Sequence, residues 1–173
     1  RDHLICYAVK ANSNIAILNL FAQLGSGFDI VSGGELWRVM KAGGNPQKTV
    51  FSGVGKNTDE MRMALDANIL CFNVESEAEL STLNQVAQTM QKIAPVSLRV
   101  NPDVDAKTHP YISTGLKENK FGMPINEAER IYLSTHRYPH IRFTGLDRHI
   151  GSHLTEIEPF MQASEKILNL LNN

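Results

Sequence analysis

The chain has 173 residues and a formal net charge of −1; hydrophobic residues make up 42% of it and charged residues 20%. This composition is typical of a globular domain with a sizeable core, and it argues against a disordered chain. The near-zero net charge argues against a nucleic-acid partner or an anionic membrane, and no apolar run approaches the roughly 20 residues that span a bilayer. Cys6 and Cys71 both lie in strand-like runs, so we expect buried thiols and a cytoplasmic location.

Strand-like and helical patterns alternate along the whole chain, with no linker between them. The expected strands are residues 4–9, 28–31, 49–52, 70–74, 96–100 and 141–149. The expected helices are residues 14–24, 34–42, 58–67, 77–90, 127–136 and 156–171. Three helix starts are spaced as capping boxes, namely Ser76 with Glu79, Asn126 with Glu129, and Thr155 with Glu158. The alternation predicts βαβ units and a parallel sheet, either in a barrel or in a doubly wound arrangement.

The first expected strand ends on Lys10, and residues 12–14 then offer helix N-caps. At such a junction we expect the stem of the lysine to pack against an apolar wall while its amine enters a cleft. Burial there would disfavour the ammonium form and lower the pKa of Lys10, which makes the amine a usable Schiff-base nucleophile. The alternative is an ordinary strand-end lysine that reaches into solvent.

A histidine, His149, ends the last expected strand and precedes Gly151, which permits close backbone approach. A flat imidazole at this position could hold an aromatic ring, or it could simply bond to solvent. His149 and His153 are spaced like a helical zinc pair, but Gly151 and the incoming strand interrupt any helix there. We therefore expect no metal site.

Two further segments carry charge where it needs an explanation. Arg99 lies inside an apolar strand and cannot lose its charge, so it needs an acceptor; a structural ion pair with Asp29 or Asp103 is one reading. Residues 53–58 contain a Gly-Lys pair, but they lack the glycine spacing of a P-loop and the Ser or Thr that follows its lysine. Nucleotide binding is therefore not expected.

Five motifs resemble one family, and they occur in that family's order: residues 7–12, 27–36, 51–56, 98–102 and 149–152. The chain resembles the pyridoxal-phosphate-dependent decarboxylases of the alanine-racemase-like barrel family. The loop at residues 109–122 is more similar to the diaminopimelate decarboxylases than to the ornithine or arginine enzymes. The resemblance implies an α/β fold, a partial TIM (β/α)8 barrel of the alanine-racemase type with about six βα units. We expect residues 1–173 to be part of the pyridoxal-phosphate-binding barrel domain, in a fragment that lacks about two strands and the C-terminal β domain.

The resemblance implies decarboxylation of meso-2,6-diaminopimelate to L-lysine and carbon dioxide, with pyridoxal 5'-phosphate as cofactor. In the family, the residue matching Lys10 forms the Schiff base and the residue matching His149 stacks on the pyridine ring. The residue matching Arg99 lies near the phenolic oxygen, and the one matching Ser152 bonds the phosphate. Asp29 matches an acid near the lysine and the ring, so we expect it to contact the cofactor.

The resemblance also implies a homodimer with shared active sites, in which Lys120 pairs with an acid of the second subunit. Arg148 and His153 depart from the family pattern, which usually has a cysteine and a glutamine at these two positions. The alternatives are another basic amino-acid decarboxylase of the ornithine or arginine type, an alanine-racemase-like enzyme, or a non-catalytic pyridoxal-phosphate-binding barrel.

Overall fold

The structure is a computed structural model, and it describes residues 2–101, 121–151 and 155–171. The strands are β1 (Cys6–Ala8), β2 (Gly27–Ile30), β3 (Thr49–Phe51), β4 (Cys71–Val74), β5 (Ala94–Asn101), β6 (Met123–Pro124) and β7 (Ile141–Asp147). The α-helices are α1 (Ile15–Gln23), α2 (Gly33–Lys41), α3 (Thr58–Asp66), α4 (Glu77–Thr89), α5 (Ile125–Leu133) and α6 (Glu158–Leu171). Short 3₁₀ helices cover Val9–Ala11, Pro46–Lys48 and Thr135–Arg137.

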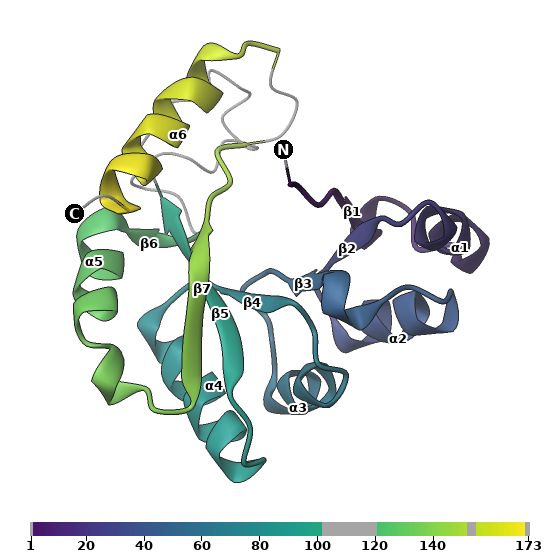
Figure 1. Ribbon diagram of the computed structural model, residues 1–173, viewed down its shortest axis with the longest axis horizontal. Coiled ribbons are helices and arrows are strands. Elements are labelled where there is room, and N and C mark those ends of the chain that lie inside the picture. Colours follow the sequence, from purple (N-terminus) through teal and green to yellow (C-terminus); the bar gives the residue numbers. More distant parts are fainter. Residues whose placement is uncertain (1, 102–120, 152–154, 172–173) are drawn as a thin grey trace.

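The strands form one curved sheet in which every described pairing is parallel. Strands β1 to β5 are neighbours in chain order, and both β6 and β7 pair with β5. The helices lie outside the curve of the sheet (Figure 1). A doubly wound sheet would carry helices on both faces, so that alternative is wrong and the predicted partial barrel is confirmed.

Side chains alternate strictly between the two faces of the middle strands. The outward set is apolar and fully buried under the helices: Phe28, Ile30, Phe51, Phe72, Val74 and Leu98. The inward set includes Asp29, Asn73 and Arg99, which line a cavity inside the curve. One face of the sheet therefore supplies the hydrophobic core and the other supplies the polar site.

The expected elements are present within a few residues at each end, but two of the capping predictions are wrong. Ser76 does cap α4, since its Oγ accepts a hydrogen bond from the Glu79 amide at 3.2 Å. Asn126 caps nothing because β6 runs directly into α5, which begins at Ile125 behind Pro124. Likewise α6 begins at Glu158, too late for Thr155 to be its cap. The two-residue strand β6 was not expected.

An exposed ion cluster fastens α5 and the 3₁₀ turn after it to α4. Glu77, in the first turn of α4, accepts hydrogen bonds from Arg130 at 2.5 Å and from the Tyr138 hydroxyl at 2.8 Å, and Arg137 lies 3.3 Å away. The hydrogen bond from Arg130 is the main cause that lowers the pKa of Glu77 to about 2. This carboxylate therefore stays charged well into the acid range.

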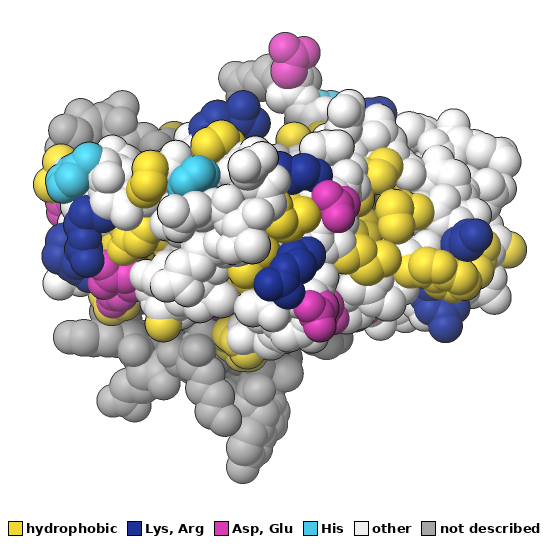
Figure 2. Space-filling model, turned by 90° about the horizontal axis from the view of Figure 1, so that it is seen from below, with side chains coloured by type: hydrophobic (Ala, Val, Ile, Leu, Met, Phe, Trp, Pro, Cys, Tyr) yellow, Lys and Arg dark blue, Asp and Glu magenta, His cyan; other side chains and the backbone are white. Residues whose placement is uncertain are grey.

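The surface carries mixed charge. On the face drawn in Figure 2, basic and acidic side chains are interspersed with small hydrophobic groups. In the part of the chain that the structure describes, no helix is long and apolar enough to cross a membrane.

Candidate active site

A cavity of about 850 Å³ opens inside the curve of the sheet, at the carboxyl ends of the strands. Successive strands each contribute to its lining, which includes Ala8, Asp29, Ser52, Asn73, Arg99 and Asp147. Because parallel strands all end on the same side of such a sheet, residues far apart in sequence meet here. The volume falls in the range of small-molecule sites, roughly 300–1,000 Å³.

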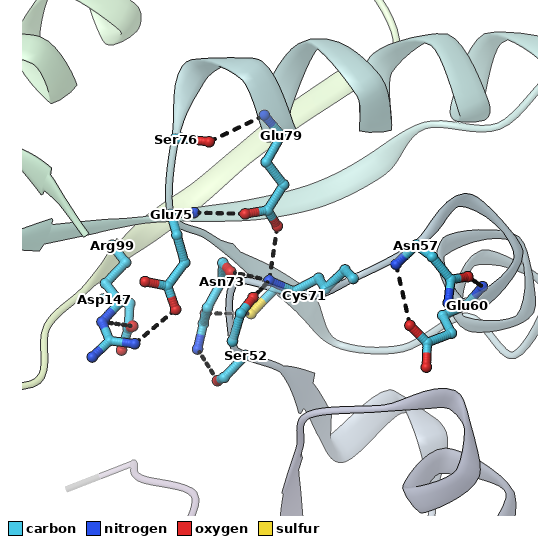
Figure 3. A network of polar contacts seen from close by, with 12 residues as sticks. Ser52, Asn57, Glu60, Cys71, Asn73, Glu75, Ser76, Glu79, Arg99 and Asp147 are labelled. Atoms are coloured by element: carbon cyan, nitrogen blue, oxygen red, sulfur yellow. Dashed lines mark hydrogen bonds and ion pairs between the residues drawn. The ribbon is translucent and has the colours of Figure 1, made fainter. Parts of the chain in front are cut away.

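The floor of the cavity is a chain of hydrogen bonds across three neighbouring strands. The Ser52 hydroxyl donates to Asp29 Oδ1 at 2.6 Å. Asn73 Nδ2 donates to Ser52 Oγ at 3.0 Å (Figure 3). The Cys71 thiol donates weakly to Asn73 Oδ1 at 3.7 Å. These contacts hold the Asp29 carboxylate at a fixed place on the floor.

Arg99 is buried beside two carboxylates. Its Nη1 donates to Glu75 Oε1 at 2.7 Å, and its Nε lies 3.8 Å from Asp147 Oδ2 (Figure 3). Asp147 is the neighbour of Arg99 in the register of β5 and β7, which explains the second contact. The alternative reading of an ion pair between Arg99 and Asp29 is therefore wrong, and Asp103 lies outside the described residues. Burial raises the pKa of Asp147, although Arg99 acts in the opposite direction.

Glu75 ties this arginine to the chain that follows β5. Its Oε2 accepts a hydrogen bond from the Gly122 amide at 3.0 Å. The adjacent Phe121 ring lies over the guanidinium, with 5.3 Å between the ring centroid and Arg99 Cζ. Gly122 has a φ of +76°, and a Cβ there would lie 3.1 Å from the Arg99 carbonyl oxygen, so glycine suits this close approach.

Lys10 follows β1 directly, inside the 3₁₀ turn, and lines the cavity. Its position confirms a lysine at the strand end. The expected burial is wrong, however, because Lys10 is exposed. Only Val9 of that turn is buried, so the neighbouring residue, and not Lys10, packs into the core.

His149 lies two residues beyond the end of β7 and lines the same cavity. Partial burial lowers its pKa, and the positive charges of Arg99 and Lys10 lower it further. The imidazole is therefore neutral at neutral pH. The structure brings the predicted site residues Lys10, Asp29, Arg99 and His149 together around one cavity.

Arg148, one of the two positions that depart from the family pattern, lines the cavity and also contacts α6. Its Nη2 donates to Ser164 Oγ of α6 at 2.6 Å, and its guanidinium lies over Phe160 at 5.9 Å. The charge of Arg148 is thus engaged by α6 at the cavity rim. The predicted site residue Ser152, the second departure His153 and the predicted interface residue Lys120 all lie outside the described residues.

Two cavity residues, Ser52 and Asn73, were missed from sequence, and so was Glu75, which binds the cavity residue Arg99. Each lies at or directly after the end of a strand, which is where polar residues of a parallel barrel reach the site. Their position after an apolar run was the available signal. Both cysteines are free thiols, as expected, but they are half-buried. Burial raises the pKa of Cys71 to about 11, so this thiol is not activated.

Active sites of parallel α/β barrels lie where this cavity lies, at the carboxyl ends of the strands. The amine of Lys10, the guanidinium of Arg99 and the imidazole of His149 suit an aromatic cofactor that carries an aldehyde. The fold and the cavity together therefore define a cofactor-binding barrel domain. The chain belongs to the pyridoxal-dependent decarboxylases. The family model described as "Pyridoxal-dependent decarboxylase, pyridoxal binding domain" matches residues 1–173.

Similar proteins bear the name diaminopimelate decarboxylase. The enzyme of that name from Haemophilus influenzae is 60% identical over 171 residues, covering 99% of this chain and 41% of the relative. The one from Pseudomonas aeruginosa is 61% identical over 170 residues, covering 98% of this chain and 41% of the relative. A crystal structure of the Helicobacter pylori enzyme complexed with L-lysine superposes with a TM-score of 0.96 at 50% identity, over 99% of this chain and 44% of that one. The chain thus spans about two fifths of the length of these relatives.

Proposed function

We propose that this chain is part of a diaminopimelate decarboxylase, which converts meso-2,6-diaminopimelate to L-lysine and carbon dioxide. One observation carries the proposal: a lysine after β1, an arginine in β5 and a histidine after β7 line one cavity, in a chain about 60% identical to enzymes of that name. The L-lysine bound to the Helicobacter pylori relative is the product that this reaction would release.

The residues present fit pyridoxal phosphate. The cavity has room for a cofactor of this size and offers an exposed amine, Lys10, to its aldehyde. Arg99 would hold the phenolic oxygen, His149 would stack on the ring, and Asp29 would contact it from the floor. We propose Ser152 as a phosphate contact. When bound, the cofactor supplies an electron sink for the electrons released as carbon dioxide leaves.

The charges of the chain's own residues support this assignment. A neutral His149 can stack on the ring without adding a cation next to Arg99 and Lys10. Glu75 and Asp147 hold the guanidinium of Arg99 in place, so its orientation is set before a ligand arrives. The exposed amine of Lys10 is free to change position, and we expect it also to deliver or remove a proton.

We further propose that residues 1–173 form part of a single barrel domain. The complete enzyme would be a homodimer whose active sites are shared between subunits, with Lys120 near the interface. A cytoplasmic location is supported by the two free thiols, since disulfides are rare in a reducing compartment.

The experiment is a decarboxylation assay on the full-length enzyme that contains this chain. We expect carbon dioxide from meso-diaminopimelate and none from L-ornithine or L-arginine. Lys10→Ala should abolish the release, whereas Lys41→Ala, on the outer helix α2 where Lys41 lies over Trp37, should leave it unchanged. Release of carbon dioxide from ornithine or arginine alone would show that the enzyme is an ornithine or arginine decarboxylase instead. Cofactor binding without any release would indicate a non-catalytic carrier.

A further inference from the structure

Lys56 is a fully buried lysine that the proposed chemistry does not use. Its side chain has 0% exposure. The ammonium donates to the Gly53 carbonyl at 2.5 Å, the Asn73 carbonyl at 2.8 Å and Glu79 Oε1 at 2.7 Å. A lysine ammonium has three N–H donors, and three acceptors lie within hydrogen-bond distance here. Lys56 is therefore held from three directions.

The three acceptors belong to three separate parts of the cavity's framework. Gly53 lies in the loop after β3, and Gly53, Val54 and Gly55 form one wall of the cavity. Asn73 lies in β4, where its side chain donates to Ser52 and so supports the floor. Glu79 lies in the first turn of α4. A single ammonium thus joins the wall, the floor and the helix behind them.

The carboxylate of Glu79 extends this contact towards Arg99. Its Oε2 accepts a hydrogen bond from the Glu75 backbone amide at 3.0 Å, while the Glu75 side chain binds Arg99 (Figure 3). The contacts run without a gap from Lys56 through Glu79 and Glu75 to the guanidinium. A shift of the Lys56 ammonium would therefore displace both the 53–55 wall and the guanidinium of Arg99.

Net stability is a poor explanation for this pair. Removing two charges from water costs free energy that their attraction offsets only in part, so apolar pairs of similar volume are often as stable. What an apolar pair cannot do is fix two backbone carbonyls and one backbone amide in defined positions. The directed contacts of Lys56 and Glu79 therefore matter mainly for geometry.

We propose that Lys56 and Glu79 form a positioning pair, which fixes the 53–55 wall and the Ser52–Asn73 floor and thereby the orientation of the bound cofactor and substrate. This inference rests on the proposed function. Neither residue touches the reacting atoms in this account; both act through the residues that line the cavity.

The test compares variants of the full-length enzyme. Lys56→Met removes the charge, and the double variant Lys56→Met/Glu79→Leu also removes the orphaned carboxylate, so that it folds even if the single variant does not. Lys92→Met is the matched control, because Lys92 also binds a backbone carbonyl and a carboxylate, Leu65 at 2.9 Å and Asp66 at 2.8 Å, outside the candidate cavity. The readouts are melting temperature, the visible circular dichroism of added pyridoxal phosphate, and kcat against KM.

We expect the double variant to melt near the wild type, with an altered cofactor dichroism and a kcat lower by about 10- to 100-fold. The control should match the wild type in every readout. Wild-type dichroism and kcat in the double variant would overturn the inference, and so would failure of both Lys56 variants to fold. If the wild type binds the cofactor but releases no carbon dioxide, the proposed function fails while the dichroism still decides the role of the pair.

Discussion

Removal of the Glu75 carboxylate should destabilise the barrel domain more than the loss of any exposed ion pair. Its side chain is 3% exposed and that of Arg99 is 11% exposed. Glu75→Ala removes the 2.7 Å contact to Arg99 and the 3.0 Å contact from the Gly122 amide. The guanidinium is then left to Asp147, whose Oδ2 lies 3.8 Å from Nε.

The magnitude follows from the burial of this pair. Removing one partner of a buried ion pair costs about 3–5 kcal/mol, and the nearby Asp147 should keep Glu75→Ala near the low end, about 3 kcal/mol. For a domain of roughly 150–250 residues this lowers the melting temperature by about 6–12 °C. Differential scanning calorimetry of the full-length enzyme without cofactor measures the shift.

Asp59→Ala is the control, since its pair with Arg62 on α3 is exposed, with side chains 91% and 46% accessible. Such a pair contributes about 0–1 kcal/mol, so the control should melt within about 4 °C of the wild type. Equal shifts in the two variants would refute the claim that Glu75 is the buried counter-ion of Arg99.

Three further predictions follow from other parts of the molecule. Phe51→Ala should lower the free energy of unfolding, measured with denaturant, by about 3–5 kcal/mol because Phe51 is fully buried. Leu133 is 80% exposed, so Leu133→Ala should lower it by less than about 0.5 kcal/mol. Similar losses in the two variants would show that Phe51 is not in the core. His149→Ala should weaken cofactor binding by about 0.5–1.5 kcal/mol in a fluorescence titration, and an unchanged affinity would make the histidine structural. The lowered pKa of Glu77 means that its contribution to stability is present above its ordinary pKa of 4.5 and is lost as the pH falls towards about 2. The melting temperatures of the wild type and Glu77→Gln should therefore converge over that range, and a constant difference would contradict the assigned ion cluster.

Periodicity was enough to predict most of this fold. The strands and helices alternate with clear apolar patterns, so their order and parallel pairing follow from sequence. Sequence patterns failed where two elements meet without a loop. Strand β6 is too short to show a pattern, and α5 begins at Ile125, directly after β6, although Asn126 has the composition of a cap. A capping residue type therefore predicts a helix start only where a non-helical residue precedes the helix at that position.

Candidate site residues were predictable from sequence where they lie in a motif. They were less predictable where their contacts depend only on the packing of neighbouring strands. Lys10, Asp29, Arg99 and His149 could be proposed from sequence because each lies in a recognisable motif at or near a strand end, and all four line the cavity. The carboxylates that bind Arg99 were not identified, because an ion pair depends on which strands are neighbours. Glu75 follows β4, the strand next to β5, and Asp147 faces Arg99 across the register of β5 and β7. The spacing of residues in the sequence reveals neither which strands are neighbours nor which residues face each other across them.

We expect the cofactor to be attached to Lys10. Borohydride reduction of the full-length enzyme loaded with pyridoxal phosphate, followed by peptide mapping, identifies the attached residue. A stable pyridoxyl group is expected on the peptide that contains Lys10, and none on that peptide in Lys10→Ala. Lys56 should stay unlabelled because its buried ammonium is engaged by three acceptors. A pyridoxyl group on Lys56 or Lys120, with Lys10 unmodified, would show that Lys10 is not the attachment site.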